Sequence, residues 1–287
     1  MTILFSKILI FLFAVHNKSK PPVIDTVEKT IQNVFDEYPL NQAIDEIPLT
    51  NRESVAIARK LSSRINNLKK NKDCPTCWFQ KKHCICSECP PLISSNFPMK
   101  RLFVFMHHKE IGLAVDTAKL LLSCIPDAQL VINGILPKYQ SSLEEMLSIC
   151  EKESDETLVL FPDETAQTFE SINDLNIPNK WNVIVLDGTW SQANRMHSYI
   201  PSHIQRIQLH PSSLDELGYQ IRRHPIAWKQ ISTLEATRIL IGNMIDVYHS
   251  DEQMVMEYKR NWCDSLSLYQ TILNDAARKQ LGPPRLK

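Results

Sequence analysis

Short apolar segments alternate with longer segments of helical periodicity from residue 101 onward, and this alternation restricts the fold more than any other feature. Strands are expected at 101–106, 129–135, 157–161 and 182–186, with further strand-like runs at 206–209 and 219–222. Helices are expected at 111–124, 141–151, 190–197, 232–248 and 253–274. Strands that alternate with helices build a mostly parallel sheet with helices on both faces. The sequence therefore predicts an α/β fold.

Three of the expected strands end in polar or charged residues, at 107–110, 161–165 and 187–192. In open α/β sheets, ligands bind beyond the carboxyl ends of the strands. We therefore expect a ligand site at this edge of the sheet. The chain has six glycines and contains neither G-x-G-x-x-G nor G-x-x-x-x-G-K-[ST], which argues against the usual dinucleotide fingerprint and against P-loop chemistry.

Five of the eight cysteines are crowded between residues 74 and 89. Such crowding suits a metal site in a reducing compartment better than a disulfide framework. The pattern Cys74-x2-Cys77-x6-Cys84-x-Cys86 supplies four thiolates for a closed, structural zinc site. A second ligand set replaces Cys84 with Cys89, because C-x2-C is the commoner spacing. Spacing alone leaves both sets open.

The formal net charge is zero, from 32 basic and 32 acidic residues, so no global field attracts the chain to nucleic acid. A local exception is the stretch 59–82, where Asp73 is the one acidic residue among the basic residues Arg59, Lys60, Arg64, Lys69, Lys70, Lys72, Lys81 and Lys82. A zinc module flanked by lysines can dock on RNA phosphate, and a solvated helix face is the alternative.

The strand at 182–186 leads directly into the hexapeptide Asp187-Gly188-Thr189-Trp190-Ser191-Gln192. The strand brings Asp187 to the sheet edge, and Gly188 permits close approach of the backbone to a ligand. Thr189 and Gln192 fit a T-x-x-Q capping box that begins the next helix. The structural alternative is that Asp187 caps a turn and Trp190 fills the core.

Three further segments are candidates for binding. Ser232-Thr233-Leu234-Glu235 fits a capping box before a long helix, and the free amides of a helix start can also bind a carboxylate or phosphate. Arg222, beside Arg223, can grip phosphate or carboxylate. His107, at a strand end, is either a base or a structural histidine with its hydrogen bonds satisfied.

Taken in order, these motifs resemble the DTW-domain family of tRNA-uridine aminocarboxypropyltransferases. The resemblance extends from about residue 74 to residue 248, and the D-x-T-W motif stands at 187–190. The other matching segments are the cysteines 74, 77, 84 and 86, the H-P-x-E-like segment 107–110, the turn 161–162, the strand 219–222 and the S-T-L-E-A run 232–236. Asp116-Thr117 departs slightly, because the family often has Asn-Thr there.

The resemblance implies a SPOUT-like fold, in which a C-terminal trefoil knot holds S-adenosylmethionine in its loops. It also favours Cys84 over Cys89 as a ligand of structural Zn²⁺. The expected divisions of the chain are an apolar leader at 1–20, disordered or targeting, a helical N-terminal region at 21–72, a zinc-binding module at 73–92, the DTW catalytic domain at 93–275 and a C-terminal tail at 276–287.

The activity implied by the resemblance is transfer of the 3-amino-3-carboxypropyl group of S-adenosylmethionine to N3 of a tRNA uridine, with release of methylthioadenosine. The implied catalytic residues are Asp187, as base or orienting group, and Trp190, as stacking partner. Implied cofactor-binding residues are Phe161, Pro162, Asp187, Gly188, Thr189, Ser232, Thr233, Leu234 and Glu235. Implied substrate-binding residues are His107, Glu110 and Arg222.

The implied partner is tRNA, and the sequence indicates neither membrane association nor an obligate protein partner. The apolar run at 8–15 is shorter than the roughly 20 residues that a bilayer span needs. We expect a cytoplasmic or nuclear protein, unless the leader directs it to an organelle or elsewhere. Two alternative functions stay open, a SPOUT-like RNA methyltransferase and a non-catalytic zinc-containing RNA-binding module.

Overall fold

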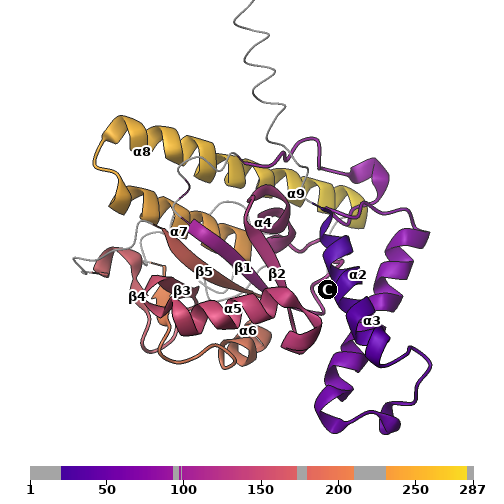
Figure 1. The fold of residues 1–287 in the computed structure, drawn as a ribbon. Coiled ribbons are helices and arrows are strands. Elements are labelled where there is room, and N and C mark those ends of the chain that lie inside the picture. Colours follow the sequence, from indigo (N-terminus) through magenta and orange to yellow (C-terminus); the bar gives the residue numbers. More distant parts are fainter. Residues whose placement is uncertain (1–20, 93–96, 98, 173–179, 210–230, 283–287) are drawn as a thin grey trace, which may run out of the picture.

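The structure of the protein is a computed structural model that describes residues 21–92, 97, 99–172, 180–209 and 231–282. Within these residues one sheet contains six strands, β1 (Met99–His107), β2 (Ala128–Asn133), β3 (Thr157–Leu160), β4 (Gln167–Thr168), β5 (Trp181–Asp187) and β6 (Gln205–Gln208). Their order is β2-β1-β5-β3-β6-β4, and every neighbouring pair is parallel (Figure 1). The predicted parallel α/β sheet is confirmed.

The central strands are buried on both faces. Leu102 and Val104 of β1 pack into one hydrophobic core, whereas Phe103 and Phe105 pack into the other. Every residue of β5 is buried. A strand that is covered on both sides reads as a nearly continuous apolar run, which explains why 183–186 shows no polar alternation.

Helices cover both faces of the sheet. One face carries α4 (Ala118–Cys124) and α7 (Thr233–Tyr248), and the other carries α5 (Ser141–Lys152) and α6 (Trp190–His197). Outside α7 lie α8 (Glu252–Lys259), a π-helical turn (Arg260–Asp264) and α9 (Ser265–Leu281) (Figure 1). Apolar side chains of these outer helices extend the first core over α7.

The N-terminal region consists of α2 (Val23–Glu37) and α3 (Leu49–Lys70), which pack on each other beside β2 (Figure 1). The Oγ of Ser54 donates a hydrogen bond to the carbonyl oxygen of Gly134 after β2, at 3.2 Å. Arg64 donates to the carbonyl oxygens of Lys109 and Ile111 after β1, at 2.7 Å each. The helix α3 therefore lies against the carboxyl edge of β1 and β2.

The sheet changes winding direction between β1 and β5. From β1 the chain passes through α4 to β2 on one side, whereas from β5 it passes through α6 to β6 on the other. Such a switch point leaves a crevice beyond the carboxyl ends of the two neighbouring strands. The ends of β1 and β5 are His107 and Asp187, so the switch point falls at two of the predicted site residues.

Two helix predictions differ from the structure. The helix expected at 111–124 begins at Ala118, because Gly112 has a positive φ of 82° and the carboxylate of Asp116 accepts hydrogen bonds from the amides of Ala118 and Lys119. The helix expected at 253–274 is interrupted by the π-helical turn and continues to Leu281. The trefoil knot stays a prediction, because residues 210–230 lie outside the described residues.

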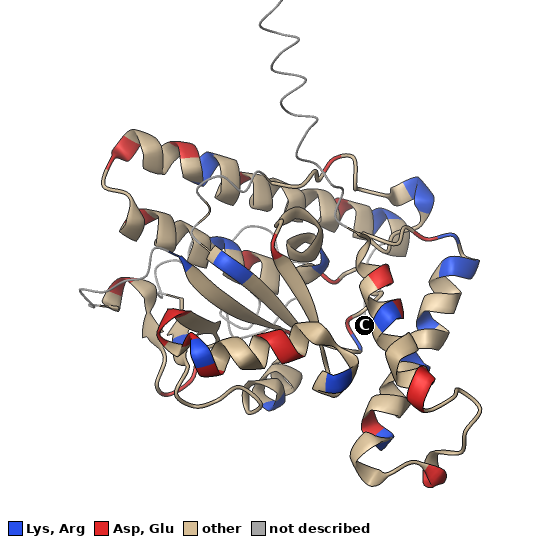
Figure 2. Cartoon of the chain, viewed as in Figure 1, with Lys and Arg blue, Asp and Glu red and all other residues tan. Residues whose placement is uncertain are grey.

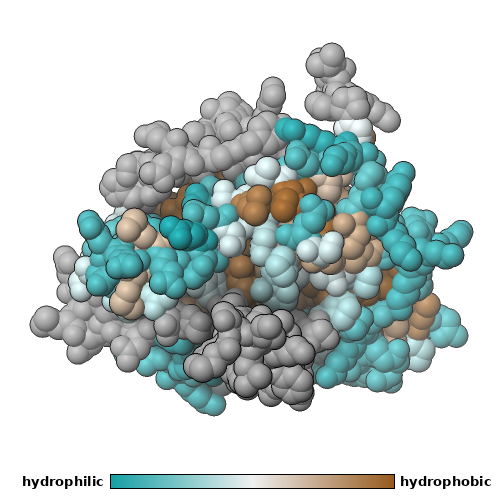
Figure 3. Space-filling model, turned by 90° about the horizontal axis from the view of Figure 1, so that it is seen from above, coloured by the Kyte–Doolittle hydropathy of each residue, from teal (hydrophilic) through white to brown (hydrophobic). Residues whose placement is uncertain are grey.

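The face seen from above in Figure 3 is mostly hydrophilic over the described residues, and hydrophobic residues show there in small groups. In the same part of the chain, we find no helix that combines the length and the apolar character needed to cross a membrane. The apolar leader at 1–20 lies outside the described residues.

Candidate functional site

A cavity of about 430 Å³ opens at the carboxyl edge of the sheet. It is formed by residues that follow β3, β5 and β6 and by the start of α7. Its described lining residues are Leu160, Phe161, Pro162, Asp163, Val185, Leu186, Gly188, Trp190, Ala193, Gln208, Leu209, Ile231, Ser232, Thr233 and Ala236. This volume, with a mainly apolar lining and a few polar groups, is typical of a small-molecule site.

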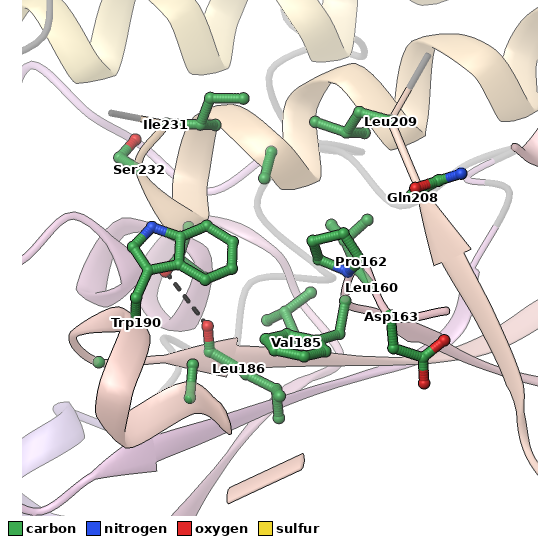
Figure 4. A pocket seen from close by; sticks show the side chains of 15 residues that line it. Leu160, Pro162, Asp163, Val185, Leu186, Trp190, Gln208, Leu209, Ile231 and Ser232 are labelled. Atoms are coloured by element: carbon green, nitrogen blue, oxygen red, sulfur yellow. Dashed lines mark hydrogen bonds between the residues drawn. The ribbon is translucent and has the colours of Figure 1, made fainter. Parts of the chain in front are cut away.

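Polar side chains line the cavity on two sides, and one of these sides also carries an aromatic ring. Figure 4 shows Trp190 and Ser232 on one side, with Asp163 and Gln208 on the other. The ring of Trp190 lies 5.9 Å from that of Phe161, measured between ring centroids. The cavity thus offers flat apolar surfaces together with hydrogen-bonding groups, which suits a ligand with an aromatic base and polar substituents.

Asp187, the last residue of β5, stands in the chain between Leu186 and Gly188, which both line this cavity. Its side chain is buried, with 6% of its surface exposed. The hydroxyl of Thr233 donates a hydrogen bond to Oδ1 of Asp187 at 2.7 Å and lies 3.4 Å from the carbonyl oxygen of Leu186. Thr233 is the first residue of α7, so this contact fixes the end of β5 to the helix that borders the cavity.

Gly188 allows three elements to meet closely. A Cβ atom added at Gly188 would lie 3.0 Å from Oε1 of Gln192 and 3.3 Å from Cβ of His107. The predicted capping box is confirmed: the amide of Thr189 donates to Gln192 Oε1 at 2.7 Å, and the amide of Gln192 donates to Thr189 Oγ1 at 3.4 Å. The close approach that glycine permits is therefore to the end of β1 and to the first turn of α6.

His107 and Glu110 lie on the β1 side of Asp187, away from β3. Nδ1 of His107 accepts a hydrogen bond from the amide of Lys109 at 3.2 Å, and the ring stacks on that of His108 at 4.4 Å between centroids. Burial, together with the charges of Lys109 and Arg195, lowers the pKa of His107. Glu110 is buried, and its amide donates to the carbonyl oxygen of His107 at 2.9 Å.

Sequence reasoning missed a charged cluster beside the cavity. Asp163 Oδ2 lies 3.3 Å from Nε2 of His197 and 3.7 Å from Nε of Arg206. Burial raises the pKa of Asp163, but hydrogen bonds from Thr165 and the charges of His197 and Arg206 outweigh it, so the pKa lies below its usual value. Asp163 is therefore a carboxylate at neutral pH. The one signal in the sequence was its position directly after a strand and a proline.

The other predicted cofactor-binding residues already make contacts within the protein. The amide of Phe161 already donates to the carbonyl oxygen of Ile207 at 3.0 Å, although its ring lines the cavity. Leu234 is buried in the core. Ser232 caps α7 by accepting from the amide of Glu235, whose carboxylate pairs with Arg238 at 2.7 Å instead of completing a capping box. Arg222 lies outside the described residues.

The cysteine cluster forms a second site, with its four sulfur atoms within 4.8 Å of one another. Sγ of Cys74 lies 3.6 Å from that of Cys86, and Sγ of Cys77 lies 3.7 Å from that of Cys84. Zn–S bonds of about 2.3 Å in a tetrahedron separate the sulfurs by about 3.8 Å, so this set fits a metal ion. Cys89 is buried outside the cluster, which decides the open choice in favour of Cys84.

The thiols of this cluster perturb one another. Hydrogen bonds with Cys77 and Cys86 lower the pKa of Cys74, and hydrogen bonds with Cys74 raise the pKa of Cys77 to about 11 and that of Cys86 above its ordinary value. Four thiolates can coexist at this spacing when a cation offsets their charge. The donor set and its geometry therefore suit a divalent metal.

Lys119 is a fully buried lysine beneath the cysteine cluster. Its Nζ lies 4.1 Å from the ring centroid of Phe79 and 5.5 Å from that of Trp78, and it donates to the carbonyl oxygen of Ala114 at 2.8 Å. Burial lowers the pKa of Lys119 to about 8, against the opposing charges of Asp116 and of the cysteine thiolates. Nothing in the sequence distinguished this lysine from a surface residue.

Comparison with known proteins assigns the chain to a family. The model of the DTW domain matches residues 71–264, which is more than half of the chain. This protein belongs to the DTW domain family. The predicted family is confirmed by a match that begins just before the cysteine cluster and includes the cavity.

Two curated relatives carry the same name. The chain is 28% identical over 179 residues to "tRNA-uridine aminocarboxypropyltransferase 2" of Macaca fascicularis, across 61% of this chain and 57% of the relative. It is 26% identical over 184 residues to the protein of that name from Mus musculus, across 62% of this chain and 58% of the relative. The match thus spans less than two thirds of either relative. No solved structure matches the chain.

Proposed function

We propose that this protein transfers the 3-amino-3-carboxypropyl group of S-adenosylmethionine to N3 of a uridine in tRNA and releases methylthioadenosine. The observation that carries the proposal is the Asp187–Trp190 motif beside a cavity of small-molecule size, in a chain of the DTW domain family. The names of the two relatives support the same transfer. The whole activity is a proposal for this chain, because the match covers only part of each relative.

S-adenosylmethionine fits the chemistry of the cavity. The rings of Trp190 and Phe161 offer stacking surfaces for adenine, and Asp163 offers acceptors for ribose hydroxyls or for the ammonium of the amino acid part. The hydroxyls of Ser232 and Thr233 also line the cavity. Pro162 and Gly188 line the cavity, and Thr189 directly follows Gly188 as the N-cap of α6. The role predicted for Leu234 and Glu235 is indirect, because both belong to the first turn of α7.

The sulfonium of S-adenosylmethionine makes its neighbouring methylene carbon electrophilic. In the proposed reaction, uridine N3 forms a bond to this carbon, the bond from carbon to sulfur breaks, and sulfur keeps the electron pair in methylthioadenosine. The N3 proton leaves, and we assign its removal, or the orientation of the uracil edge, to Asp187. Thr233 fixes the Asp187 carboxylate for this role through the 2.7 Å hydrogen bond.

The remaining predicted roles follow from position, except that of Arg222, which rests on the family resemblance because it lies outside the described residues. Trp190 stacks on uracil or adenine, His107 and Glu110 contact the acceptor from the β1 side, and Arg222 grips a phosphate or the cofactor carboxylate. We further propose a SPOUT-like fold with a C-terminal trefoil knot. It is supported by the parallel sheet, by the missing glycine fingerprint and by the return of α7 to the end of β5. The cysteine cluster is proposed to bind structural Zn²⁺.

The test is product analysis. The purified protein is incubated with unmodified tRNA and S-adenosylmethionine, and both products are identified by mass spectrometry. Methylthioadenosine together with aminocarboxypropyl-uridine is the expected result. S-adenosylhomocysteine and methylated RNA would replace the proposal with a methyltransferase. Binding of tRNA without any turnover would replace it with an RNA-binding module.

A further inference from the structure

Three exposed cationic side chains belong to elements that meet at the end of β1, where α6 contacts β1 and α3 contacts the loop after it. Lys60 comes from α3, Lys109 from the loop after β1 and Arg195 from α6. At the same strand end the rings of His107 and His108 stack on each other. We call these five residues the rim.

The geometry of the rim is fixed by contacts between its elements. Arg64, one helical turn after Lys60 on the same face of α3, donates to the carbonyl oxygens of Lys109 and Ile111 at 2.7 Å each. The Cβ of His107 packs within 3.3 Å of the place where a Cβ of Gly188 would be. The rim is therefore a built surface that continues to the end of β5, next to Asp187.

Basic and acidic residues are interspersed over the described elements (Figure 2), so the cations of the rim form a local group. Among the described residues, none of the three cations forms an ion pair with a carboxylate, whereas Lys69, Lys138 and Lys259 each pair with an acidic side chain. The pKa of His108 is lowered to about 4 by burial and then by the charges of His107, Lys60 and Lys109. Lys60 and Lys109 thus act electrostatically on His108, and Lys109 and Arg195 act on His107. Neutral imidazoles then lie between fixed positive charges at neutral pH.

We propose that the rim binds the phosphodiester backbone of the RNA acceptor around the target nucleotide, an inference that rests on the proposed function. Lysine and arginine supply the sequence-independent affinity for phosphates, and the stacked imidazoles offer a surface for a splayed base. The cavity and the rim flank β5 on opposite sides, so the cofactor and the acceptor approach Asp187 from opposite directions.

The helix α3 gives the rim a feature that the family match does not contain. Its residues end at Lys70, directly before the matched range of 71–264. Lys60 therefore adds an acceptor contact from outside the DTW domain. The second basic surface of the chain, at the cysteine cluster with Lys81 and Lys82, is the competing location for RNA.

The experiment measures binding of unmodified tRNA by the full-length protein as a function of salt, in the absence of S-adenosylmethionine. The rim variant combines Lys60→Gln, Lys109→Gln and Arg195→Gln. A matched control is Lys152→Gln, an exposed lysine at the end of α5 on the opposite edge of the sheet. A Lys81→Gln, Lys82→Gln variant tests the competing surface. Binding of S-adenosylmethionine, read by calorimetry, reports whether the cavity is intact.

The rim variant is expected to bind tRNA about tenfold more weakly or worse, while its affinity for S-adenosylmethionine and its melting temperature stay unchanged. The plot of log K against log salt has a negative slope, to which each phosphate contact with single-stranded RNA contributes about 0.7. Loss of three contacts should therefore make this slope shallower by about 2. Wild-type binding of tRNA by the rim variant would overturn the inference. So would a loss that occurs in the Lys81, Lys82 variant instead, or failure of the wild type to bind tRNA.

The two proposals fail differently. If the wild type binds tRNA through the rim and forms no aminocarboxypropyl-uridine, the proposed function fails and the rim stands. If the wild type forms that product and the rim variant does so with an unchanged KM for tRNA, the function stands and the rim fails.

Discussion

The cysteine cluster and the carboxyl edge of the sheet are the two candidate binding sites of the protein, and they are assembled in opposite ways. The cluster takes its four sulfurs from residues 74–86, whose local turns bring them within 4.8 Å of one another. The side chains at the carboxyl edge come from segments as distant in sequence as His107 and Thr233, and they meet only when the whole sheet has formed. Damage to the cluster should therefore affect folding, whereas damage to the edge should affect chemistry.

Loss of the metal is expected to have the largest effect. In Cys77→Ala we expect loss of bound zinc and a large fall in melting temperature, because structural zinc sites in small peptides contribute about 10–16 kcal/mol. The measurements are metal content by mass spectrometry and thermal unfolding. Cys89→Ala is the matched control and should keep one zinc. Zinc loss in the control, with retention in Cys77→Ala, would contradict the ligand set.

At the edge, Asp187→Asn is expected to lower the rate of transfer about 10²- to 10⁴-fold, the range for removal of a general base. Its melting temperature and zinc content should match those of the wild type, since the amide can still accept the hydrogen bond from Thr233. Single-turnover kinetics give the rate. Asp155→Asn, an exposed acid elsewhere, should leave it unchanged. Full activity of Asp187→Asn would remove Asp187 from the chemical step.

Lys119 connects the cysteine cluster to the α/β domain, because it belongs to α4 and is buried beneath the cluster. Lys119→Met keeps an unbranched apolar side chain as long as the aliphatic part of lysine and removes the ammonium that donates to the carbonyl oxygen of Ala114. We expect a loss of about 1–3 kcal/mol in the free energy of unfolding, the cost of leaving a buried acceptor unpaired. Urea denaturation measures it, with Lys152→Met as the exposed control. An unchanged stability would show that the ammonium is dispensable beneath the cluster.

The smallest expected effect is at Asp163. Replacement by Asn removes one charge from the cavity and should weaken S-adenosylmethionine binding about tenfold, as expected for a charged hydrogen bond of about 1.4 kcal/mol. Calorimetry provides the affinity. Unaltered affinity would place the ammonium and ribose of the cofactor elsewhere in the cavity.

The sequence predicted the features that depend on local pattern. The strands at 101–106 and 182–186, the capping box of Thr189 and Gln192 and the crowding of cysteines all follow from neighbouring residues, and all are confirmed. The choice between Cys84 and Cys89 needed the family resemblance, because both spacings are chemically acceptable. The structure supports that choice by leaving Cys89 outside the cluster.

Features that depend on distant contacts were beyond the sequence. Asp163, His197 and Arg206 come from three segments, and no spacing rule connects them. The helix expected at 111–124 lost its first half to a glycine with positive φ and to a carboxylate cap, which periodicity alone does not reveal. A two-residue strand such as β4 is shorter than any pattern that sequence periodicity can detect.

In the proposed reaction, a carbon of the amino acid side of S-adenosylmethionine, and not its methyl group, is transferred at this edge. The most direct measurement uses S-adenosylmethionine labelled either in the carboxyl group or in the methyl group, with tRNA as acceptor. We predict that the carboxyl label enters tRNA, in amounts equal to the methylthioadenosine released, and that the methyl label stays with methylthioadenosine. Entry of the methyl label into tRNA, with S-adenosylhomocysteine as the second product, would contradict the account.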